Sequence, residues 1–319
     1  MSSASDGRPR IVSLLASGTE IVAALGLGDR LVGISHECDH PTELLDRPRV
    51  SRPRFDPEGL SSGEIDRAVR DAMLEHGSVY ALDAERLESL DPDVVLTQAV
   101  CEVCAVPTAG VEETIARLGV SPEVVSLDAH TIEEILDSIG TVGRAGGAVD
   151  AAGDVVAGLR ARMERVAEAT AGATRPRVLA IEWLDPPFAP GHWVPGMIER
   201  AGAECLLGEA GRPSREVAWE DVAGLDPDAL LIMPCGYGLE ASRADADAHA
   251  DRLAAVAPRA IAAGRAWVVD GSAYFNRSGP RVVTGVEILA GLLHPDRVEA
   301  PDPATAAVWT PAERISATT

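Results

Sequence analysis

The chain has 319 residues, of which 46% are hydrophobic, and this length is sufficient for two domains with separate cores. Its formal net charge is −22, with 50 acidic residues against 28 basic residues that are all arginine. An acidic chain of this kind is not expected to bind nucleic acid or an anionic membrane surface.

The N-terminal residues 1–9 are polar, and we expect them to be disordered. The first apolar run, Ile11–Ala16, is too short for a signal peptide, and no stretch approaches the roughly 20 apolar residues of a membrane span. The sequence therefore predicts a cytoplasmic protein without membrane insertion. In that compartment its five cysteines are reduced, and they are available for packing, metal binding or redox chemistry.

Strand and helix patterns alternate from Arg10 onward. Such alternation is typical of a parallel sheet, with ligand-binding groups at the carboxyl ends of the strands. The tetrapeptide Ser17-Gly-Thr-Glu20 has the pattern of a capping box, which predicts that a helix starts there. In the N-terminal lobe, residues 10–143, we predict strands at Ile11–Leu15, Arg30–Ile34, Val94–Thr97 and Val124–Leu127, and helices at Ile21–Leu25, Val111–Leu118 and Ile132–Val142.

The next stretch lacks any strand pattern. Between about residues 144 and 173, apolar residues recur every three or four positions, from Val149 to Val166. A helix of this length is roughly 40 Å long at about 1.5 Å per residue. We therefore predict one long helix, within residues 144–175, that links two lobes.

A second α/β lobe is predicted over residues 176–295. After His294-Pro295 the composition is rich in proline, alanine and threonine, so residues 296–319 are expected to form a flexible tail. The predicted elements of the lobe are strands at Arg177–Ile181, Ala229–Met233 and Ala266–Val269, and helices at Val194–Ala201, Arg252–Ala263 and Pro280–Leu293.

The tetrapeptide Leu-Asp-Pro-Asp occurs twice, at Leu90–Asp93 and Leu225–Asp228. Each copy has a glutamate five residues before its leucine, an apolar run after it, and a cysteine within a few residues of that run. One copy alone describes a helix end, a turn and a buried strand. Two copies indicate two similar lobes with a ligand cleft between them.

These features together resemble the Fe/B12 periplasmic-binding domain, and above all its cobalamin-binding substrate-binding proteins of ABC transporters. The resemblance covers roughly residues 10–293 and depends on the order and spacing of several motifs. They are Ser13–Glu20, Val32–Ser35 with Asp39–Pro41, both Leu-Asp-Pro-Asp copies, Asp185–Phe188 with Ala201–Ala203, and Tyr274–Arg281.

The resemblance implies a class III substrate-binding-protein architecture, in which a single long helix joins two Rossmann-like lobes with parallel sheets and the ligand lies between them. It also implies docking to a membrane permease through one glutamate on each lobe, matched here by Glu85 and Glu220. Helix-terminal residues that complement the helix dipole are the alternative reading of both glutamates. The chain departs from the family because it shows no export signal, and because the stretches near Val79 and Gln98 lack tryptophans that would contact a corrin ring.

Cysteine and histidine side chains follow two predicted strands of the N-terminal lobe. One loop carries His36 and Cys38, the other carries Cys101 and Cys104, and Cys235 follows the equivalent strand of the second lobe. Thiolate and imidazole ligands of this kind suit zinc or another thiophilic metal. Packing beneath the loops and dithiol redox chemistry at Cys101 and Cys104 are the alternatives.

Eight of the eleven aromatic residues fall in the second lobe, several of them in loops after predicted strands. Aromatic faces suit a flat macrocyclic ligand, and an arginine suits its carboxylate or phosphate. His192 has the chemistry of an axial metal ligand, although a solvent-facing loop histidine has the same pattern. The candidate ligand-binding residues are Ser17, Phe188, His192, Trp193, Tyr237, Tyr274 and Arg277.

The sequence thus supports a binding protein for cobalamin, a related tetrapyrrole or another metal-containing cofactor. Its role would be that of a carrier, chaperone or sensor that delivers its ligand to a permease or to a cofactor-dependent enzyme. The alternative is a metal- or thiol-dependent enzyme that uses His36, Cys38, Cys101 and Cys104. The sequence lacks a Walker loop, a dinucleotide-binding fingerprint, a nucleophile elbow and a zinc-protease motif, so no reaction is indicated.

Overall fold

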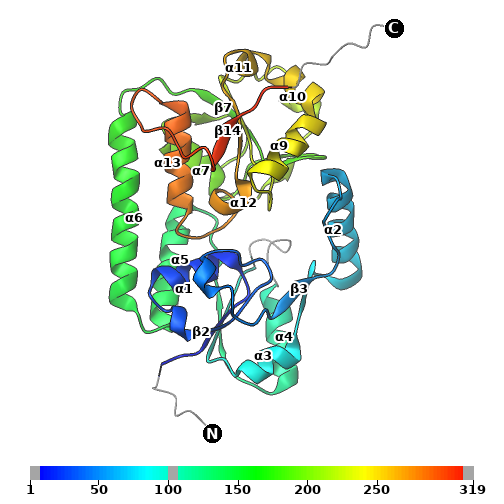
Figure 1. Cartoon of the computed structure of the whole chain (residues 1–319), viewed down its shortest axis with the longest axis vertical. Helices are drawn as coiled ribbons and strands as arrows, with labels where there is room; N and C mark the ends of the chain where they lie inside the picture. The colour runs from blue at the N-terminus through cyan, green and yellow to red at the C-terminus, as the bar shows by residue number, and fades with distance from the viewer. Residues whose placement is uncertain (1–7, 100–106, 312–319) are drawn as a thin grey trace. The chain divides into compact units, whose positions relative to one another are not determined.

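The computed structural model describes residues 8–99 and 107–311 (Figure 1). The described chain divides into two compact units. The first unit is drawn from Met1–Gly59, Arg67–Arg160 and Ser278–Pro280, and the second from Leu60–Asp66, Ala161–Arg277 and Arg281–Thr319. Two short segments, Leu60–Asp66 and Ser278–Pro280, therefore pack in a different unit from the residues on either side of them.

The first unit contains a four-stranded parallel sheet with the strand order β2-β1-β5-β6. These strands are β1 (Ile11–Ser13), β2 (Leu31–Ile34), β5 (Val94–Thr97) and β6 (Glu123–Ser126). Strand β5 is buried along its whole length, as expected for an apolar run with parallel neighbours on both sides. A separate antiparallel pair is formed by β3 (Ser51–Pro53) and β4 (Tyr80–Leu82).

The helices of the N-terminal half are α1 (Ala16–Ala24), α2 (Ser62–His76), α3 (Ala84–Leu90), α4 (Thr108–Leu118) and α5 (Ile132–Ala145), with short 3-10 turns η1 (Gly28–Arg30) and η2 (Thr42–Leu44). The three helices predicted in the N-terminal lobe are present, but two of them, α1 and α4, begin three to five residues earlier than predicted.

The second unit contains a five-stranded sheet with the order β10-β7-β12-β13-β14. Its strands β10, β7, β12 and β13 are mutually parallel, whereas β14 is antiparallel to β13. The bounds are β7 (Arg177–Ile181), β10 (Glu204–Cys205), β12 (Ala229–Ile232), β13 (Ala266–Val269) and β14 (Ala306–Val308). A small antiparallel sheet is built from β8 (Trp183–Leu184), β9 (Pro187–Ala189) and β11 (Arg215–Glu216).

The helices of this half are α6 (Val149–Thr170), α7 (Val194–Arg200), α8 (Trp219–Val222), α9 (Leu239–Ala248), α10 (Ala250–Val256), α11 (Pro258–Ala262), α12 (Gly271–Tyr274) and α13 (Val282–Leu293). The single helix predicted at Arg252–Ala263 is wrong in detail, because it is split between α10 and α11. The break falls at Ala257, directly before Pro258. A residue that precedes proline is disfavoured in the helical conformation.

The two units share one topology. In each parallel sheet the second strand along the chain comes first, followed by the first, third and fourth strands. The prediction of two α/β lobes with parallel sheets is therefore confirmed. The predicted long helix is also present as the 22-residue α6.

Both Leu-Asp-Pro-Asp copies adopt the same conformation. Asp91 and Asp226 have φ angles of 43° and 45°, a left-handed conformation that aspartate tolerates better than most residues. The second aspartate of each copy binds the start of the first strand of its sheet. Asp93 Oδ2 accepts a bond of 2.7 Å from the backbone N–H of Arg10, and Asp228 Oδ2 accepts one of 2.8 Å from that of Arg177.

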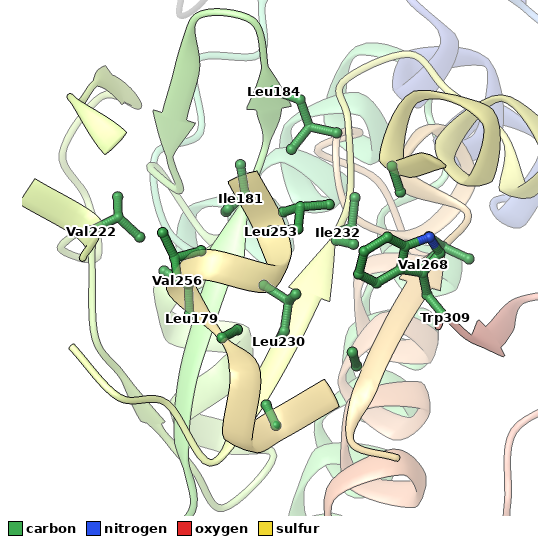
Figure 2. Packing of buried hydrophobic residues seen from close by; sticks show 14 of the residues in the cluster. Leu179, Ile181, Leu184, Val222, Leu230, Ile232, Leu253, Val256, Val268 and Trp309 are labelled. Atoms are coloured by element: carbon green, nitrogen blue, oxygen red, sulfur yellow. The ribbon is translucent and has the colours of Figure 1, made fainter. Parts of the chain in front are cut away.

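The core of the second unit extends to the end of the described chain (Figure 2). Leu179, Leu230 and Val268 on neighbouring strands pack in one cluster with Trp309, which is completely buried. The indole Nε1 of Trp309 also donates a 2.8 Å hydrogen bond to Asp247 Oδ1. The prediction of a flexible tail is therefore wrong for the residues around β14, because an indole and a fifth strand hold them on the sheet.

The capping box predicted at Ser17–Glu20 is also wrong. Helix α1 already begins at Ala16, so Ser17 lies inside its first turn and the hydroxyl does not cap the helix. A capping box occurs instead at α5, where Thr131 and Glu134 bond each other's backbone N–H groups. Glu134 also accepts a hydrogen bond from the backbone N–H of His130, which is the largest of the effects that lower its pKa.

Candidate functional site

The parallel register of each sheet places the loops that follow its strands at one edge. In the first unit, β1 leads into α1, β2 leads into the loop of His36 and Cys38, and β5 leads into Gln98. In the second unit, β7 leads into the β8–β9 hairpin, β12 into Cys235 and Tyr237, and β13 into α12. These carboxyl edges are where open α/β sheets bind ligands.

In the first unit, His36 contacts neighbours on the β3–β4 pair. Its Nδ1 lies 2.8 Å from Ser51 Oγ, and its ring centroid lies 4.6 Å from that of Tyr80. Its Nε2 lies 3.1 Å from Glu37 Oε1. The guanidinium of Arg49 donates hydrogen bonds to the carbonyls of residues 35, 36 and 38, so the Arg49 side chain fixes the backbone of this loop.

Cys38 is directed into this unit. It is 1% exposed, and its sulfur lies 3.1 Å from Thr19 Oγ1 on α1. Cys101 and Cys104 lie outside the described residues, so their predicted convergence with Cys38 stays a prediction. Within residues 8–99 and 107–311, no three histidine, cysteine, aspartate or glutamate side chains form a metal-binding group.

Ser17 is also buried, at 5% exposure. Its hydroxyl lies 3.3 Å from that of Ser278, which is one of the three residues near the C-terminus that pack in the first unit. The predicted ligand contact of Ser17 stays untested, and in this structure the hydroxyl joins two parts of the chain.

The second unit gathers aromatic side chains at its carboxyl edge. The rings of Trp183 and Tyr237, which follow β7 and β12, lie 5.3 Å apart at an angle of 59°. The Tyr237 carbonyl accepts a 3.0 Å hydrogen bond from the N–H of Ser272, on the helix that follows β13. Three strand ends are thus joined at one place. Burial raises the pKa of Tyr237 to about 12, with a further contribution from Asp245, so the phenol is neutral at physiological pH.

Polar groups flank these aromatics. Cys235 is exposed, and its backbone N–H donates a 3.0 Å hydrogen bond to the carbonyl of Glu182. Arg277 Nη2 donates to Ser272 Oγ at 3.2 Å, and the guanidinium of Arg281 lies 5.6 Å from the Tyr274 ring centroid. Phe188 is half-buried on β9, in the same small sheet as Trp183.

Two of the predicted ligand-binding residues, Trp193 and His192, make hydrogen bonds within the protein. Trp193 is 9% exposed, and its indole Nε1 donates a 2.7 Å hydrogen bond to the carbonyl of Phe275, so it anchors α7 to the loop after α12. His192 has a φ of +50°, and its backbone bonds Arg212 and Gly211. Trp183, which is not among the predicted ligand-binding residues, lies at the aromatic edge beside Tyr237, two residues after the end of β7. That position is the signal in the sequence that identifies it.

A pocket of about 520 Å³ opens at the opposite edge of the second sheet, where β7, β12 and β13 begin. Three arginines line it, but they bind structural groups. Arg259 pairs with Asp226 and Asp228, Arg265 with the Asp228 carbonyl, and Arg297 with the carbonyls after α6. These arginines therefore stabilise helix ends and turns. The pocket that they line lies at the opposite edge of the sheet from the aromatic side chains.

Comparison with known proteins gives the family. The family model described as periplasmic binding protein matches residues 11–273. The chain is 25% identical over 301 residues to YvrC of Bacillus subtilis, an ABC transporter substrate-binding lipoprotein, with 90% of this chain and 80% of that protein covered. It is 21% identical over 282 residues to a vitamin B12-binding protein of Vibrio cholerae, with 87% and 86% covered.

The fold has close counterparts among solved structures. A periplasmic heme-binding protein from Pseudomonas aeruginosa superposes with a TM-score of 0.70 at 24% identity, covering 95% of this chain and 99% of that one. At this identity the likeness shows the fold, which is that of class III substrate-binding proteins. Since the family model covers most of the sequence, the chain belongs to the periplasmic binding protein family.

Proposed function

We propose that this chain is the substrate-binding component of an ABC transporter, and that its ligand is a corrinoid, a haem or a related metal-containing tetrapyrrole. The observation that carries the proposal is the pair of aromatic side chains, Trp183 and Tyr237, at one edge of the second sheet, where α12, the helix that carries Tyr274, is hydrogen-bonded to the Tyr237 carbonyl through Ser272. The names of its relatives support the same ligand class.

The chemistry of this edge suits a flat macrocycle with an anionic substituent. The tilted rings of Trp183 and Tyr237 offer an apolar surface on which a macrocycle can stack, and each aromatic contact of this kind contributes about 0.5–1.5 kcal/mol beyond the area it buries. Arg277 offers a guanidinium for a carboxylate or phosphate of the ligand.

Ligand titration of the purified protein tests this proposal. Cyanocobalamin and haemin are added separately, and binding is followed by tryptophan fluorescence and by the absorbance of the ligand. Trp183→Leu is expected to weaken binding of the true ligand about fivefold, the effect of one aromatic contact. Trp219→Leu is the matched control, because Trp219 packs against the core from α8. Absence of binding by both tetrapyrroles, or equal affinity of the Trp183 variant and the wild type, would contradict the proposal.

The transporter role predicts a permease partner, and Glu85 and Glu220 are the glutamates proposed to dock to it. Glu85 and Glu220 are both exposed, and both lie in the first turn of the helix that precedes a Leu-Asp-Pro-Asp copy. They therefore occupy equivalent places in the two units. Glu85→Arg together with Glu220→Arg is expected to abolish ligand uptake by the native host while ligand affinity of the purified protein is retained. Uptake at the wild-type rate would exclude this docking role.

The zinc site and the enzyme alternative stay predictions, and metal analysis tests both. About one zinc per chain in purified protein, lost in Cys101→Ser and Cys104→Ser, would support them. A metal-free protein that binds a tetrapyrrole would favour the binding function. The cytoplasmic location also stays a prediction, which fractionation of the native host tests.

A further inference from the structure

The start of α2 is attached to the second unit by a buried polar contact. Residues Leu60–Asp66 pack in that unit, whereas Arg67 and the following residues belong to the first. Ser62 is 1% exposed, and its hydroxyl donates a 2.8 Å hydrogen bond to Asp245 Oδ1 on α9. The fit is close, since a Cβ on Gly63 would lie 2.5 Å from Asp185 Oδ2.

Asp245 is an unusual acceptor for this contact. The residue is 8% exposed, and its second carboxylate oxygen, Oδ2, is buried without a hydrogen-bond partner among the described residues. One helical turn away, His249 Nδ1 lies 3.3 Å from Asp245 Oδ1 and 2.9 Å from the Asp245 carbonyl. This contact adjoins the aromatic edge, because the charge of Asp245 contributes to the raised pKa of Tyr237 and the Asp185 carbonyl accepts a hydrogen bond from Trp183 Nε1.

The charge state of His249 decides whether the buried carboxylate is neutralised. A buried carboxylate is strongly disfavoured unless it is paired and fully hydrogen-bonded. When His249 is protonated it supplies that pair. When His249 is neutral, the Asp245 carboxylate keeps the hydrogen bond from Ser62 but loses its ion pair, so hydration of the carboxylate favours release of the start of α2.

We propose that Leu60–Asp66 is a proton-controlled latch: the Ser62–Asp245 hydrogen bond holds the start of α2 on the second unit while His249 carries a proton, and the hold weakens when that proton is lost.

The surroundings of His249 support the direction of this effect. Its pKa is raised, chiefly by its hydrogen bond to Asp245 and also by the charge of Asp185, against the opposing effect of burial. A raised pKa in the folded state means that the stabilisation is fully present below the ordinary value of 6.5 and is lost as the pH rises through the higher folded value. The other charged or titratable groups on the elements that meet here are Glu240, Arg243 and Asp247 on α9, Asp251 and Arg252 on α10, and Glu64, Asp66, Arg67, Arg70, Asp71, Glu75 and His76 on α2, with Tyr237 in the loop before α9.

Hydrogen exchange of the full chain between pH 5.5 and 8.5 tests the latch. After correction for the intrinsic exchange rate, amides of the segment 60–66 are expected to lose protection as the pH rises. Ser62→Ala should increase their exchange on the order of tenfold at low pH, the usual effect of losing a hydrogen bond to a charged group, and by less at high pH, where the hold is already weakened. Asp245→Asn should remove the pH dependence of this exchange. In His249→Gln, the amides of residues 60–66 should exchange at low pH as fast as those of the wild type do at high pH.

A second measurement separates a latch from a simple loss of helix stability. Ser61→Ala is the matched control, because Ser61 caps the same turn of α2 through Glu64 and does not touch Asp245. The pKa of His249, measured by NMR, is expected to fall toward its ordinary value in Ser62→Ala, to fall in Asp245→Asn and to stay unchanged in Ser61→Ala. Protection of 60–66 that is independent of pH, or pH dependence that survives in His249→Gln, would overturn the proposal.

Discussion

The two units have the same arrangement of parallel strands, but the loops that follow those strands differ in their side chains. Both sheets have the same strand order, and in both an aspartate of the Leu-Asp-Pro-Asp copy binds the backbone at the start of the first strand. The loops that follow differ. The second unit places Trp183 and Tyr237 together at its edge, while in the first unit His36 and Tyr80 pair beside Ser51. The repeat therefore specifies the scaffold, and the proposed ligand chemistry depends on the loops.

The units also differ at the last strand of the sheet. In the first unit β6 is an edge strand, whereas in the second β13 is covered by the antiparallel β14 and by Trp309. Trp309→Ala is expected to lower the free energy of unfolding by about 3–5 kcal/mol, because it empties a large, fully buried site. Chemical denaturation measures this.

The control for this variant is Val308→Ala, since Val308 is 51% exposed on the same strand and its truncation should change stability by less than about 0.5 kcal/mol. A similar loss of unfolding free energy in the two variants would show that strand β14, and not the indole of Trp309, completes the core of the second unit.

The two aspartates that end the repeat should differ in their contribution to stability. Asp93→Ala removes the acceptor for one backbone N–H, and is expected to cost about 1 kcal/mol. Asp228→Ala should cost about 2 kcal/mol, because Asp228 also lies 3.0 Å from Arg259 Nη2. Urea denaturation of each variant measures the difference. Equal costs would mean that the partly exposed Arg259 pair contributes nothing beyond the shared backbone bond.

The smallest expected effect concerns the two capping patterns of the first unit. Thr131→Ala is expected to cost about 1 kcal/mol, the usual effect of losing an N-cap, whereas Ser17→Ala leaves the start of α1 unchanged. Circular dichroism during thermal unfolding measures both. Hydrogen bonds lower the pKa of Glu134. The contribution of its carboxylate to the stability of the fold is therefore fully present above pH 4.5, the ordinary pKa, and is lost as the pH falls through the lower pKa of the folded state. A Thr131 variant with unchanged stability would contradict the cap.

The sequence predicted those parts of the fold that depend on local pattern. Strands β7 and β13 have the predicted bounds, because short apolar runs between turn residues become buried parallel strands. Strand β14 could not be predicted in this way, since its surroundings are rich in proline and alanine and only Trp309 marks it as buried. Tertiary packing decided that element.

The sequence predicted which loops, those after the strands, would form the candidate site. It did not predict which side chains of those loops point outward and which point into the protein. Tyr237 follows a strand and lies beside an aromatic partner, as a site at the carboxyl edge requires. Trp193 and Cys38 also lie in loops after strands, yet both are directed into the protein. Loop residues have no periodicity that distinguishes an inward from an outward side chain, so a contact such as Trp193 with the Phe275 carbonyl has no sequence signal.

The burial of Trp309 and the place of Ser278–Pro280 have a consequence for how the protein is made. The first unit includes residues 278–280, which follow most of the second unit in the sequence, and the core of the second unit includes Trp309. Domains often fold during synthesis, beginning with the N-terminal one. Here the first unit can acquire all of its native contacts only after residues 278–280 have left the ribosome, and the second only after Trp309 has done so, so the N-terminal unit cannot be completed before most of the second unit has been made.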